Sequence, residues 1–324
     1  MKIAITGAGS WGTTLAVLLG EKGFDVKFWA RREELANEIE IKRENLQYLP
    51  GIKIPKNVIA DYSLKDVING SEIIITTIPS EFLRNTIKQI KPYFKNQIVV
   101  SATKGLEHHS CKRMSQVIEE ELGNARIAVL SGPNHAKEVS SKMPTASVVA
   151  SKNKKACKIV AEALATPYFK LYQLNDVVGV EICGALKNIS AIATGVVDGF
   201  GFGDNARASI ITLGLMEMNN FGRHFEAKRG TVYGLAGVGD LISTCISKHS
   251  RNRFVGEQLA RSKSMEEIKK EMHGMVAEGI PTTKAVYEYS SKHGIEMSLT
   301  QQAYKVIFEN KNIKEAIKDL LSLI

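Results

Sequence analysis

A glycine-rich turn between a strand and a helix, at the start of the chain, is the feature that most constrains the fold. Residues 2–6 form an apolar run of strand length, and apolar residues recur with helical spacing after the turn. Gly7 permits the turn, Gly9 lets a pyrophosphate approach the backbone, and Gly12 lets helix and strand pack closely. The helix N-terminus then favours an anion through its free N–H groups. This context predicts a dinucleotide site, whereas the alternative is a glycine-rich loop that only turns the chain.

The second predicted strand, residues 25–29, is followed by Arg31 and Arg32. Folds of this kind that are specific for NAD usually carry an acidic residue near this point, where it binds the ribose hydroxyls. Two guanidinium groups instead suit a 2′-phosphate, because arginine binds phosphate bidentately. We therefore expect NADPH as the preferred cofactor, with NADH as the second. The alternative is a solvated arginine pair that is satisfied by Glu33 and Glu34.

Length, charge and cysteine usage restrict the class of protein. The 324 residues suggest two domains, and 44% hydrophobic residues suffice for a buried core. Four scattered cysteines without a C-x-x-C motif predict neither a disulfide framework nor a metal site. The net charge of +9 comes from dispersed lysines and arginines, so we expect no nucleic-acid partner. Because no signal-peptide pattern or apolar stretch of about eighteen residues is evident, we expect a cytoplasmic protein without an integral membrane segment.

Strands and helices continue to alternate after the second strand, which predicts an α/β fold with a Rossmann-like, doubly wound parallel sheet. From about residue 177 the pattern becomes almost entirely helical, and the small, apolar segment 178–197 predicts a long buried helix. We therefore expect a dinucleotide-binding domain at residues 1–180 and an all-helical substrate-binding domain at residues 181–324. The further predicted strands span residues 58–60, 72–76, 97–101, 126–130, 146–150 and 169–173.

Two lysines stand out against small or apolar surroundings. Lys104 follows the predicted strand 97–101, and Gly132 follows the next strand in the same way. Ligands bind at the carboxyl ends of parallel strands, so Lys104 is placed to meet an anionic or carbonyl group, unless it is a solvated loop residue. Lys187 lies in the middle of the small-residue helix, where burial would lower its pKa towards that of a general base. The alternative is a lysine that reaches solvent from the outer face of that helix.

A third polar segment, Ser250 to Asn252, offers hydroxyl, guanidinium and amide donors that suit a phosphate monoester. Asp240 could open a helix as its N-cap, and structural capping is the alternative for each of these residues singly. Glu278, beside Gly279, indicates a turn whose role is open.

Together these motifs resemble the bacterial NAD(P)-dependent glycerol-3-phosphate dehydrogenases. They run in order from residue 7 to about residue 282, and no single motif carries the resemblance alone. The matching segments are GAGSWG at 7–12, ATKG at 102–105, SGP at 131–133, LKN at 186–188, GDNAR at 203–207, AGVGDL at 236–241, SRNR at 250–253 and EG at 278–279.

The resemblance implies reversible reduction of dihydroxyacetone phosphate to sn-glycerol 3-phosphate, which supplies phospholipid synthesis. It implies that Lys187 donates and accepts the proton, that Lys104 helps to polarise the C2 oxygen, and that no metal takes part. A homodimer is the candidate assembly, although the sequence does not define the oligomeric state. The implied substrate positions are Lys104, Gly132, Asn134, Asp240, Ser250, Arg251 and Asn252. The implied cofactor positions are Gly7, Gly9, Ser10, Trp11, Gly12, Arg31, Arg32, Lys104, Ala136, Arg251, Val276 and Glu278.

The sequence departs from the family pattern at two places. Asn134 and His135 stand where many members carry Ser-Phe, and Leu213 stands where an arginine is expected. We expect a packing role for His135 rather than a role as a base, and the change at Leu213 bears on helix contacts or regulation more than on chemistry.

Two rival functions remain. A dehydrogenase of the 3-hydroxyacid or 6-phosphogluconate type would share the nucleotide-binding half and a catalytic lysine, but not the motifs at 237–241 and 250–253. A non-enzymatic NADPH sensor would need neither Lys104 nor Lys187 at the nicotinamide.

Overall fold

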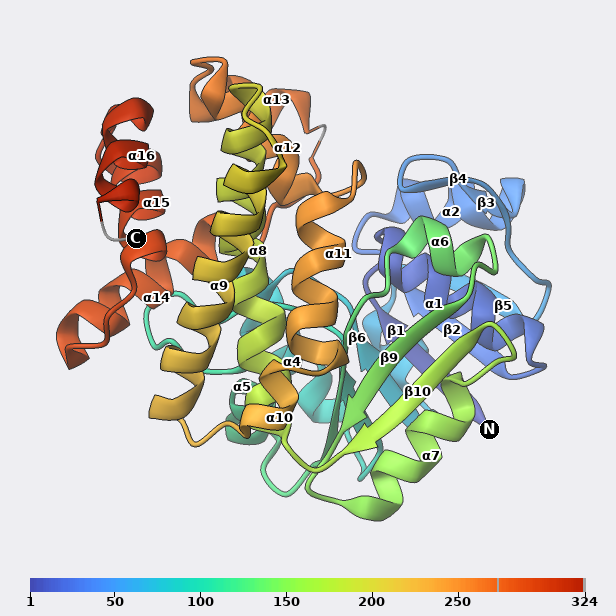
Figure 1. The fold of residues 1–324 in the computed structure, drawn as a ribbon. Helices are drawn as coiled ribbons and strands as arrows, with labels where there is room; N and C mark the ends of the chain where they lie inside the picture. Colours follow the sequence, from blue (N-terminus) through green and yellow to red (C-terminus); the bar gives the residue numbers. More distant parts are fainter. Residues whose placement is uncertain (273, 323–324) are drawn as a thin grey trace. The chain divides into compact units, whose positions relative to one another are not determined.

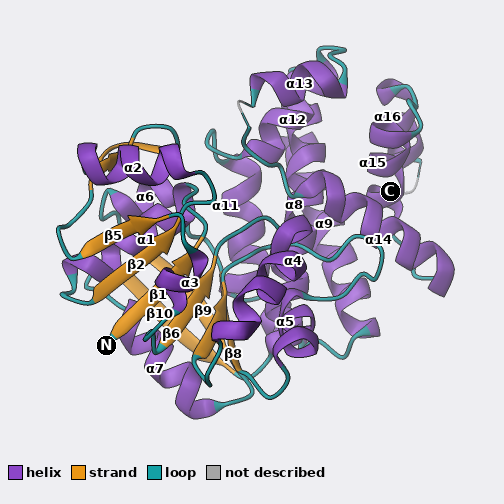
Figure 2. Cartoon of the chain, turned by 180° about the vertical axis from the view of Figure 1, so that it is seen from behind, coloured by secondary structure: helices purple, strands orange, loops and turns teal. Residues whose placement is uncertain are grey.

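The chain passes three times between two structural units in the computed structural model, which describes residues 1–272 and 274–322 (Figures 1 and 2). The first unit consists of Met1–Thr103 and Met114–Val177, and the second of Lys104–Arg113 and Val178–Ile324. Residues 104–113, which the sequence suggested for the first domain, therefore group with the helical unit. The reason is that Leu106 and Cys111 pack in the core of the helical unit and Arg113 forms an ion pair with Glu181 of that unit.

An eight-stranded sheet forms the centre of the first unit, with the order β10-β9-β8-β7-β6-β1-β2-β5. Reading from β5 to β8 gives the strand order of the doubly wound dinucleotide-binding fold, which confirms the α/β class. The strands are β1 (Lys2–Thr6), β2 (Asp25–Trp29), β5 (Val58–Asp61), β6 (Ile73–Thr76), β7 (Ile98–Ser101), β8 (Arg126–Ser131), β9 (Thr145–Ala150) and β10 (Phe169–Leu174).

The sheet is not parallel throughout, so that part of the prediction is wrong. β8 pairs antiparallel with β9, whereas β9 and β10 pair parallel. A parallel crossover usually contains a full helix, whereas the connection between these two strands contains only the short α6 (Ala136–Ser140). A separate small hairpin of β3 (Glu44–Asn45) and β4 (Leu49–Lys53) lies between β2 and β5 in the chain.

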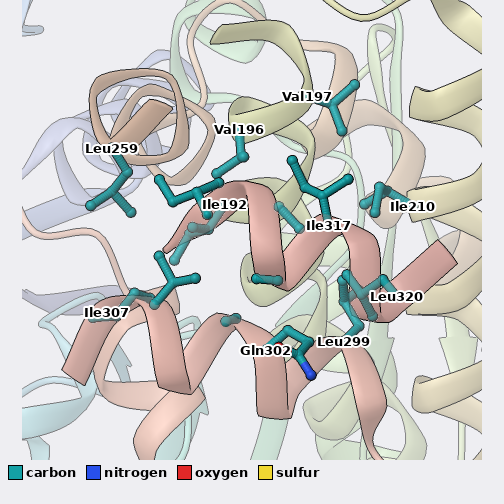
Figure 3. Close-up of a pocket in the computed structure, with 15 residues that line it drawn as sticks. Ile192, Val196, Val197, Ile210, Leu259, Leu299, Gln302, Ile307, Ile317 and Leu320 are labelled. Atoms are coloured by element: carbon teal, nitrogen blue, oxygen red, sulfur yellow. The ribbon is translucent and has the colours of Figure 1, made fainter. Parts of the chain in front are cut away.

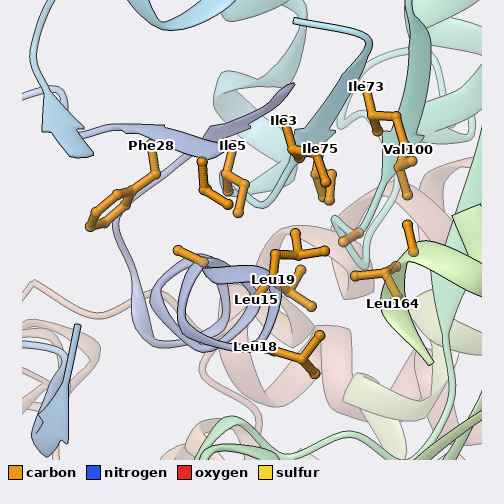
Figure 4. Close-up of a cluster of buried hydrophobic side chains, with 14 of the residues drawn as sticks. Ile3, Ile5, Leu15, Leu18, Leu19, Phe28, Ile73, Ile75, Val100 and Leu164 are labelled. Atoms are coloured by element: carbon orange, nitrogen blue, oxygen red, sulfur yellow. The ribbon is translucent and has the colours of Figure 1, made fainter. Parts of the chain in front are cut away.

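Helices cover both faces of the sheet. Alternate strand residues such as Ile3 and Ile5 pack with Leu15 and Leu19 in one cluster (Figure 4), while Ile74 belongs to the cluster on the opposite face. The helices on the first face include α1 (Ser10–Glu21), α2 (Glu33–Lys42) and α7 (Lys154–Leu164), and those on the other are α3 (Leu64–Ile68), α4 (Ser80–Ile90) and α5 (Met114–Leu122).

The long helix α8 (Val177–Gly199) is the central element of the second unit (Figure 1). Its small residues let α12 approach closely, because a Cβ on Gly195 would lie 1.9 Å from the carbonyl oxygen of Arg253. The other helices are α9 (Asp204–His224), α10 (Arg229–Val232), α11 (Asp240–Ile246), α12 (Arg251–Ala260), α13 (Met265–Glu271), α14 (Gly279–His293), α15 (Ser298–Phe308) and α16 (Ile313–Leu321), with the π-helical turn η2 (Leu235–Gly239) before α11.

Within the described residues, α8 alone is long and apolar enough to cross a membrane by length and composition. However, 89% of its most apolar window is buried in the protein. A core helix passes the same test, so the apolar character of α8 is accounted for by its neighbours in the helical unit.

Candidate active site

The glycine-rich turn joins β1 to α1 and has the geometry of an anion site. Gly7 has a φ of +115°, and a Cβ on Gly12 would lie 1.9 Å from the Gly7 carbonyl oxygen, so neither position accommodates a side chain without a shift of the backbone. A Cβ on Gly9 would meet nothing within 4 Å, which leaves open space above the turn. Among the described residues no side chain caps α1, so its first N–H groups are available to an anion. These residues fit a pyrophosphate.

The next two residues of α1 also have contacts within the first unit. Ser10 Oγ donates to the carbonyl oxygen of Tyr48 at 2.6 Å, and the Trp11 ring packs edge-on against Phe169 with ring centroids 6.3 Å apart. Thr14 Oγ1 donates to the carbonyl oxygen of Ala136 at 3.2 Å, which ties α6 to α1. The sequence-predicted residues Ser10, Trp11 and Ala136 therefore lie around one helix.

Both arginines after β2 are exposed. The Arg31 guanidinium lies over the Phe82 ring at 5.8 Å, and Arg32 Nη2 donates to Gln47 Oε1. Within the part of the chain that the structure describes, neither arginine forms an ion pair with Glu33 or Glu34. The pair is therefore solvated, as the alternative has it, but within the described residues it has no ion pair with those two acids.

The loop after β8 carries the remaining predicted residues of this edge. Gly132 has a φ of +126°, so a glycine suits this turn. Asn134 is buried, and the carbonyl oxygen of His135 accepts the N–H groups of Glu138 and Val139 as α6 begins. His135 is the N-cap residue of α6.

The second unit brings Lys104, Lys187, Asp240 and Thr244 together in one buried group, here called the lysine–aspartate cluster. Lys187 Nζ donates to Asp240 Oδ1 at 2.5 Å and to Thr244 Oγ1 at 2.8 Å, and Lys104 Nζ donates to Asp240 Oδ2 at 2.9 Å. The side chains of Lys187, Asp240 and Lys104 are 7%, 2% and 16% exposed. Lys187 therefore does not reach out to solvent, and Lys104 is not a solvated loop residue.

The electrostatics of the cluster follow from burial and from its three charges. Desolvation lowers the pKa of Lys104 to about 7, with the Asp240 carboxylate opposing the shift and the Lys187 ammonium adding to it. Desolvation alone would raise the pKa of Asp240, but Lys104 and Lys187 outweigh it and hold that pKa below its ordinary value. The cluster thus contains a firmly ionised carboxylate and a lysine that exchanges its proton near neutral pH.

Local structure explains how Asp240 reaches both lysines. Gly239 occupies the N-cap of α11, so Asp240 is the first residue of the helix and its carboxylate turns to the ammonium groups. The alternative in which Asp240 is itself the N-cap is wrong. Thr244 lies one turn further along the same helix face. Thr244 was not predicted from the sequence, although its spacing of four residues from Asp240 was a usable signal.

Ser250, Arg251 and Asn252, at the start of α12, have different surroundings. Ser250 caps α12, because its Oγ accepts the N–H of Arg253 at 3.2 Å, while Arg251 is exposed in the first turn. Asn252 is buried, and its Nδ2 donates to Asn188 Oδ1 at 2.9 Å. An amide carries two hydrogens, and Asn188 is the one acceptor found for Asn252 Nδ2 among the described residues, so a second hydrogen is available.

Asn252 also joins this segment to the loop that carries Val276 and Glu278. Its Oδ1 accepts the N–H of Gly279 at 2.9 Å, at the start of α14. The start of α12, with the predicted substrate positions Ser250 to Asn252, therefore lies next to the start of α14, which follows the loop with the predicted cofactor positions Val276 and Glu278.

An apolar cavity of about 50 Å³ lies elsewhere in the helical unit, with side chains from α8, α9, α12, α15 and α16 around it (Figure 3). Gln302 is the polar side chain in its wall, and Gln302 Oε1 accepts a hydrogen bond from Lys311 Nζ at 2.7 Å. A phosphorylated ligand would lose its hydration there without gaining partners, so this cavity does not suit a charged substrate.

Family models match both parts of the chain. The model described as "NAD-dependent glycerol-3-phosphate dehydrogenase N-terminus" matches residues 2–157, and the corresponding C-terminus model matches residues 176–318. A protein named "Glycerol-3-phosphate dehydrogenase [NAD(P)+]" from Chlorobium phaeobacteroides is 48% identical over 326 residues, which cover 99% of this chain and 98% of that protein. A protein of the same name from Moorella thermoacetica is 44% identical and covers 98% of this chain and 95% of its own length.

Solved structures agree with these matches over the whole length. The glycerol-3-phosphate dehydrogenase of Coxiella burnetii superposes with a TM-score of 0.96 at 39% identity, covering 99% of this chain and 98% of that one. The enzyme of the same name from Saccharomyces cerevisiae has a TM-score of 0.85 at 33% identity and covers 99% of both chains.

Proposed function

Because this chain belongs to the NAD-dependent glycerol-3-phosphate dehydrogenase family, we propose that its lysine–aspartate cluster provides the proton for the reaction of that family. The protein is an NAD(P)-dependent oxidoreductase that interconverts dihydroxyacetone phosphate and sn-glycerol 3-phosphate. The bound nicotinamide cofactor supplies or removes the hydride at C2. The cluster observed around Asp240 is the observation that carries the proposal, since it holds two ammonium groups where an alkoxide would form.

Lys187 is the proposed proton donor and acceptor. Its ammonium group is oriented by two hydrogen bonds, to Asp240 and to Thr244, within a buried helix. As the C2 oxygen gains negative charge during reduction, Lys187 donates a proton to it, and in the reverse direction the neutral amine takes that proton back. Lys104 polarises the same oxygen, and Asp240 keeps both lysines in place.

The activity is tested by following nicotinamide absorbance with dihydroxyacetone phosphate and, separately, with NADPH and NADH. We expect rapid oxidation of the cofactor with the phosphorylated ketone, much slower oxidation with unphosphorylated dihydroxyacetone, and none without a ketone. A protein that binds NADPH without oxidising it would support the sensor function instead. Turnover of a 3-hydroxyacid in place of the phosphorylated ketone would support the rival dehydrogenase.

We propose a preference for NADPH, supported by the two exposed arginines after β2 and the absence of an acid at that point in the sequence. Replacing Arg31 and Arg32 together by glutamine should weaken NADPH binding by about 1–3 kcal/mol, because charge-assisted hydrogen bonds to the 2′-phosphate are lost. NADH binding should change little. The affinities of both cofactors are measured by fluorescence, and an unchanged ratio between them in the double variant would refute the preference.

We propose that Arg251 and Asn252 bind the substrate phosphate, with Arg251 as the exposed cation and Asn252 as a fixed amide donor. The variant Arg251→Lys keeps the charge but loses the planar pair of donors, so kcat/KM for dihydroxyacetone phosphate should fall by about tenfold. Unphosphorylated dihydroxyacetone is the control substrate. If both substrates lose the same factor, the phosphate assignment is wrong.

The remaining expectations concern the cell. We propose that the enzyme supplies sn-glycerol 3-phosphate for phospholipid synthesis, in the cytoplasm and as a homodimer. The name shared by the relatives fits this supply, and light scattering of the purified protein tests the dimer. A single mass near the 35.6 kDa of one chain across the working concentration range would exclude it.

A further inference from the structure

Residues 104–113 leave the sheet after β7, join the helical unit and return to the sheet at α5. This segment, here called the 104–113 excursion, carries Lys104. It closes on itself, because Leu106 and Arg113 form an antiparallel bridge and the Glu107 N–H donates to the carbonyl oxygen of Lys112 at 2.9 Å. Lys104 therefore lies two residues from a closed hairpin.

The excursion is fixed to α8 by apolar contacts and by charge. Leu106 and Cys111 are buried in the same hydrophobic cluster as Ile182 and Cys183 of α8. Arg113 Nη1 lies 2.8 Å from Glu181 Oε2, and these two side chains are 14% and 3% exposed. A buried ion pair is costly to desolvate, so breaking one partner is expensive and the geometry of the pair is strongly defined.

Glu181 and Lys187 belong to the same helix, six residues apart. At 1.5 Å per residue this separation is about 9 Å along the helix axis. α8 thus carries Lys187 directly, and through Glu181 and Arg113 it holds the hairpin that carries Lys104. Asp240 bonds to both lysines, which requires that the two ammonium groups keep a fixed separation.

We propose that Arg113 and Glu181 are positioning residues that place Lys104 against Asp240 for catalysis. This inference rests on the role proposed above for Lys104. Neither residue needs to touch the substrate, because both act through the backbone of the excursion. The Arg113–Glu181 ion pair keeps Lys104 in the helical unit, although the chain on both sides of residues 104–113 belongs to the first unit.

The test removes both charges of the pair together, so that neither is left without the other. The double variant Arg113→Met/Glu181→Gln replaces both charges by neutral groups of similar size, a change that often leaves folding stability intact. We expect kcat/KM for dihydroxyacetone phosphate to fall by about tenfold to hundredfold, as for a misplaced catalytic group. In a Lys104→Met background the same two changes should cost less than about twofold, because residues that act through one group are not additive. NADPH affinity should be unchanged.

A matched control comes from the first unit. Arg84 of α4 pairs with Glu120 and Glu121 of α5, and Arg84→Met removes these two ion pairs, whose side chains are 25%, 39% and 14% exposed and which contain no residue of the excursion. It should lower the melting temperature without changing kcat/KM. If the double variant does not fold, Arg113→Lys, which keeps the charge, is measured in both backgrounds and should show a smaller loss that again disappears without Lys104.

The outcomes separate the two proposals. An equal loss with and without Lys104, or no loss at all, would overturn the positioning role. Wild-type kcat/KM in Lys104→Met alone would instead contradict the role of Lys104 itself.

Discussion

Replacing Lys187 by methionine should lower turnover of dihydroxyacetone phosphate by about a hundredfold to ten-thousandfold, the range for losing one general acid–base group. Methionine keeps the length and apolar stem of lysine, and Lys104 remains to neutralise Asp240. The variant should therefore fold and bind NADPH with nearly unchanged affinity. Turnover and cofactor fluorescence are measured on the same preparation, so that chemistry and binding are separated.

Lys104→Met is the decisive comparison, because burial lowers the pKa of Lys104 to about 7 and a proton donor works best near its own pKa. If Lys187 is the donor, Lys104→Met should lose less turnover than Lys187→Met. Lys248→Met, at an exposed lysine of the same unit, should behave as the wild type. Near-normal turnover in Lys187→Met, or a loss explained by failure to fold, would make Lys104 the leading candidate for the proton donor.

Features that depend on local patterns could be predicted from the sequence. The β-branched run at 72–76 predicted β6, and the glycines at 7, 9 and 12 predicted the turn between β1 and α1. Both rest on residues close together in the chain, where alternation and backbone sterics decide the conformation. The small residues of segment 178–197 likewise predicted the buried helix α8, which the structure extends to Val177–Gly199.

Features that depend on chain direction were harder to predict. Segment 146–150 looks the same whether it pairs parallel or antiparallel, and only the shortness of α6 indicates that β9 runs back beside β8. The helix α5 begins only at Met114, because Cys111 has a φ of +53° inside the hairpin of the excursion. No local pattern marks that hairpin as part of the helical unit.

The candidate site likewise has features that the sequence predicts and features that it does not. Lys104, Lys187 and Asp240 were each identified from unusual polar character, but the alternatives for the two lysines could only be rejected once burial was known. Asp240 binds both lysines at once, but Lys104 lies 136 positions and Lys187 lies 53 positions before it in the chain. No spacing rule predicts contacts over such separations. Arg113 and Glu181 were missed because a charged residue in a helix or loop is ordinarily solvated.

Replacing Asp240 by asparagine should destabilise the protein by about 3–5 kcal/mol near neutral pH, the usual cost of removing one partner from a buried ion pair. Asparagine keeps the shape of the side chain but leaves two ammonium groups close together without a counter-charge. Asp204→Asn is the control, since Asp204 also forms an ion pair, with Arg207, but is 92% exposed, and an exposed pair contributes only about 0–1 kcal/mol. Urea unfolding gives both values.

The destabilisation caused by Asp240→Asn should depend on pH. In the wild type the folded pKa of Lys104, about 7, lies below its ordinary value of 10.5, so the unfolded chain binds more protons between those values and stability rises with pH there. Without the Asp240 carboxylate, which opposes that shift, the folded pKa of Lys104 falls further and the rise begins at lower pH. The loss in Asp240→Asn should therefore be larger at pH 6, where Lys104 of the folded wild type is charged and pairs with Asp240, than at pH 9, where Lys104 is neutral in both folded proteins. Equal losses at the two pH values would mean that Lys104 does not depend on Asp240, and the cluster would then have to be explained through Lys187 alone.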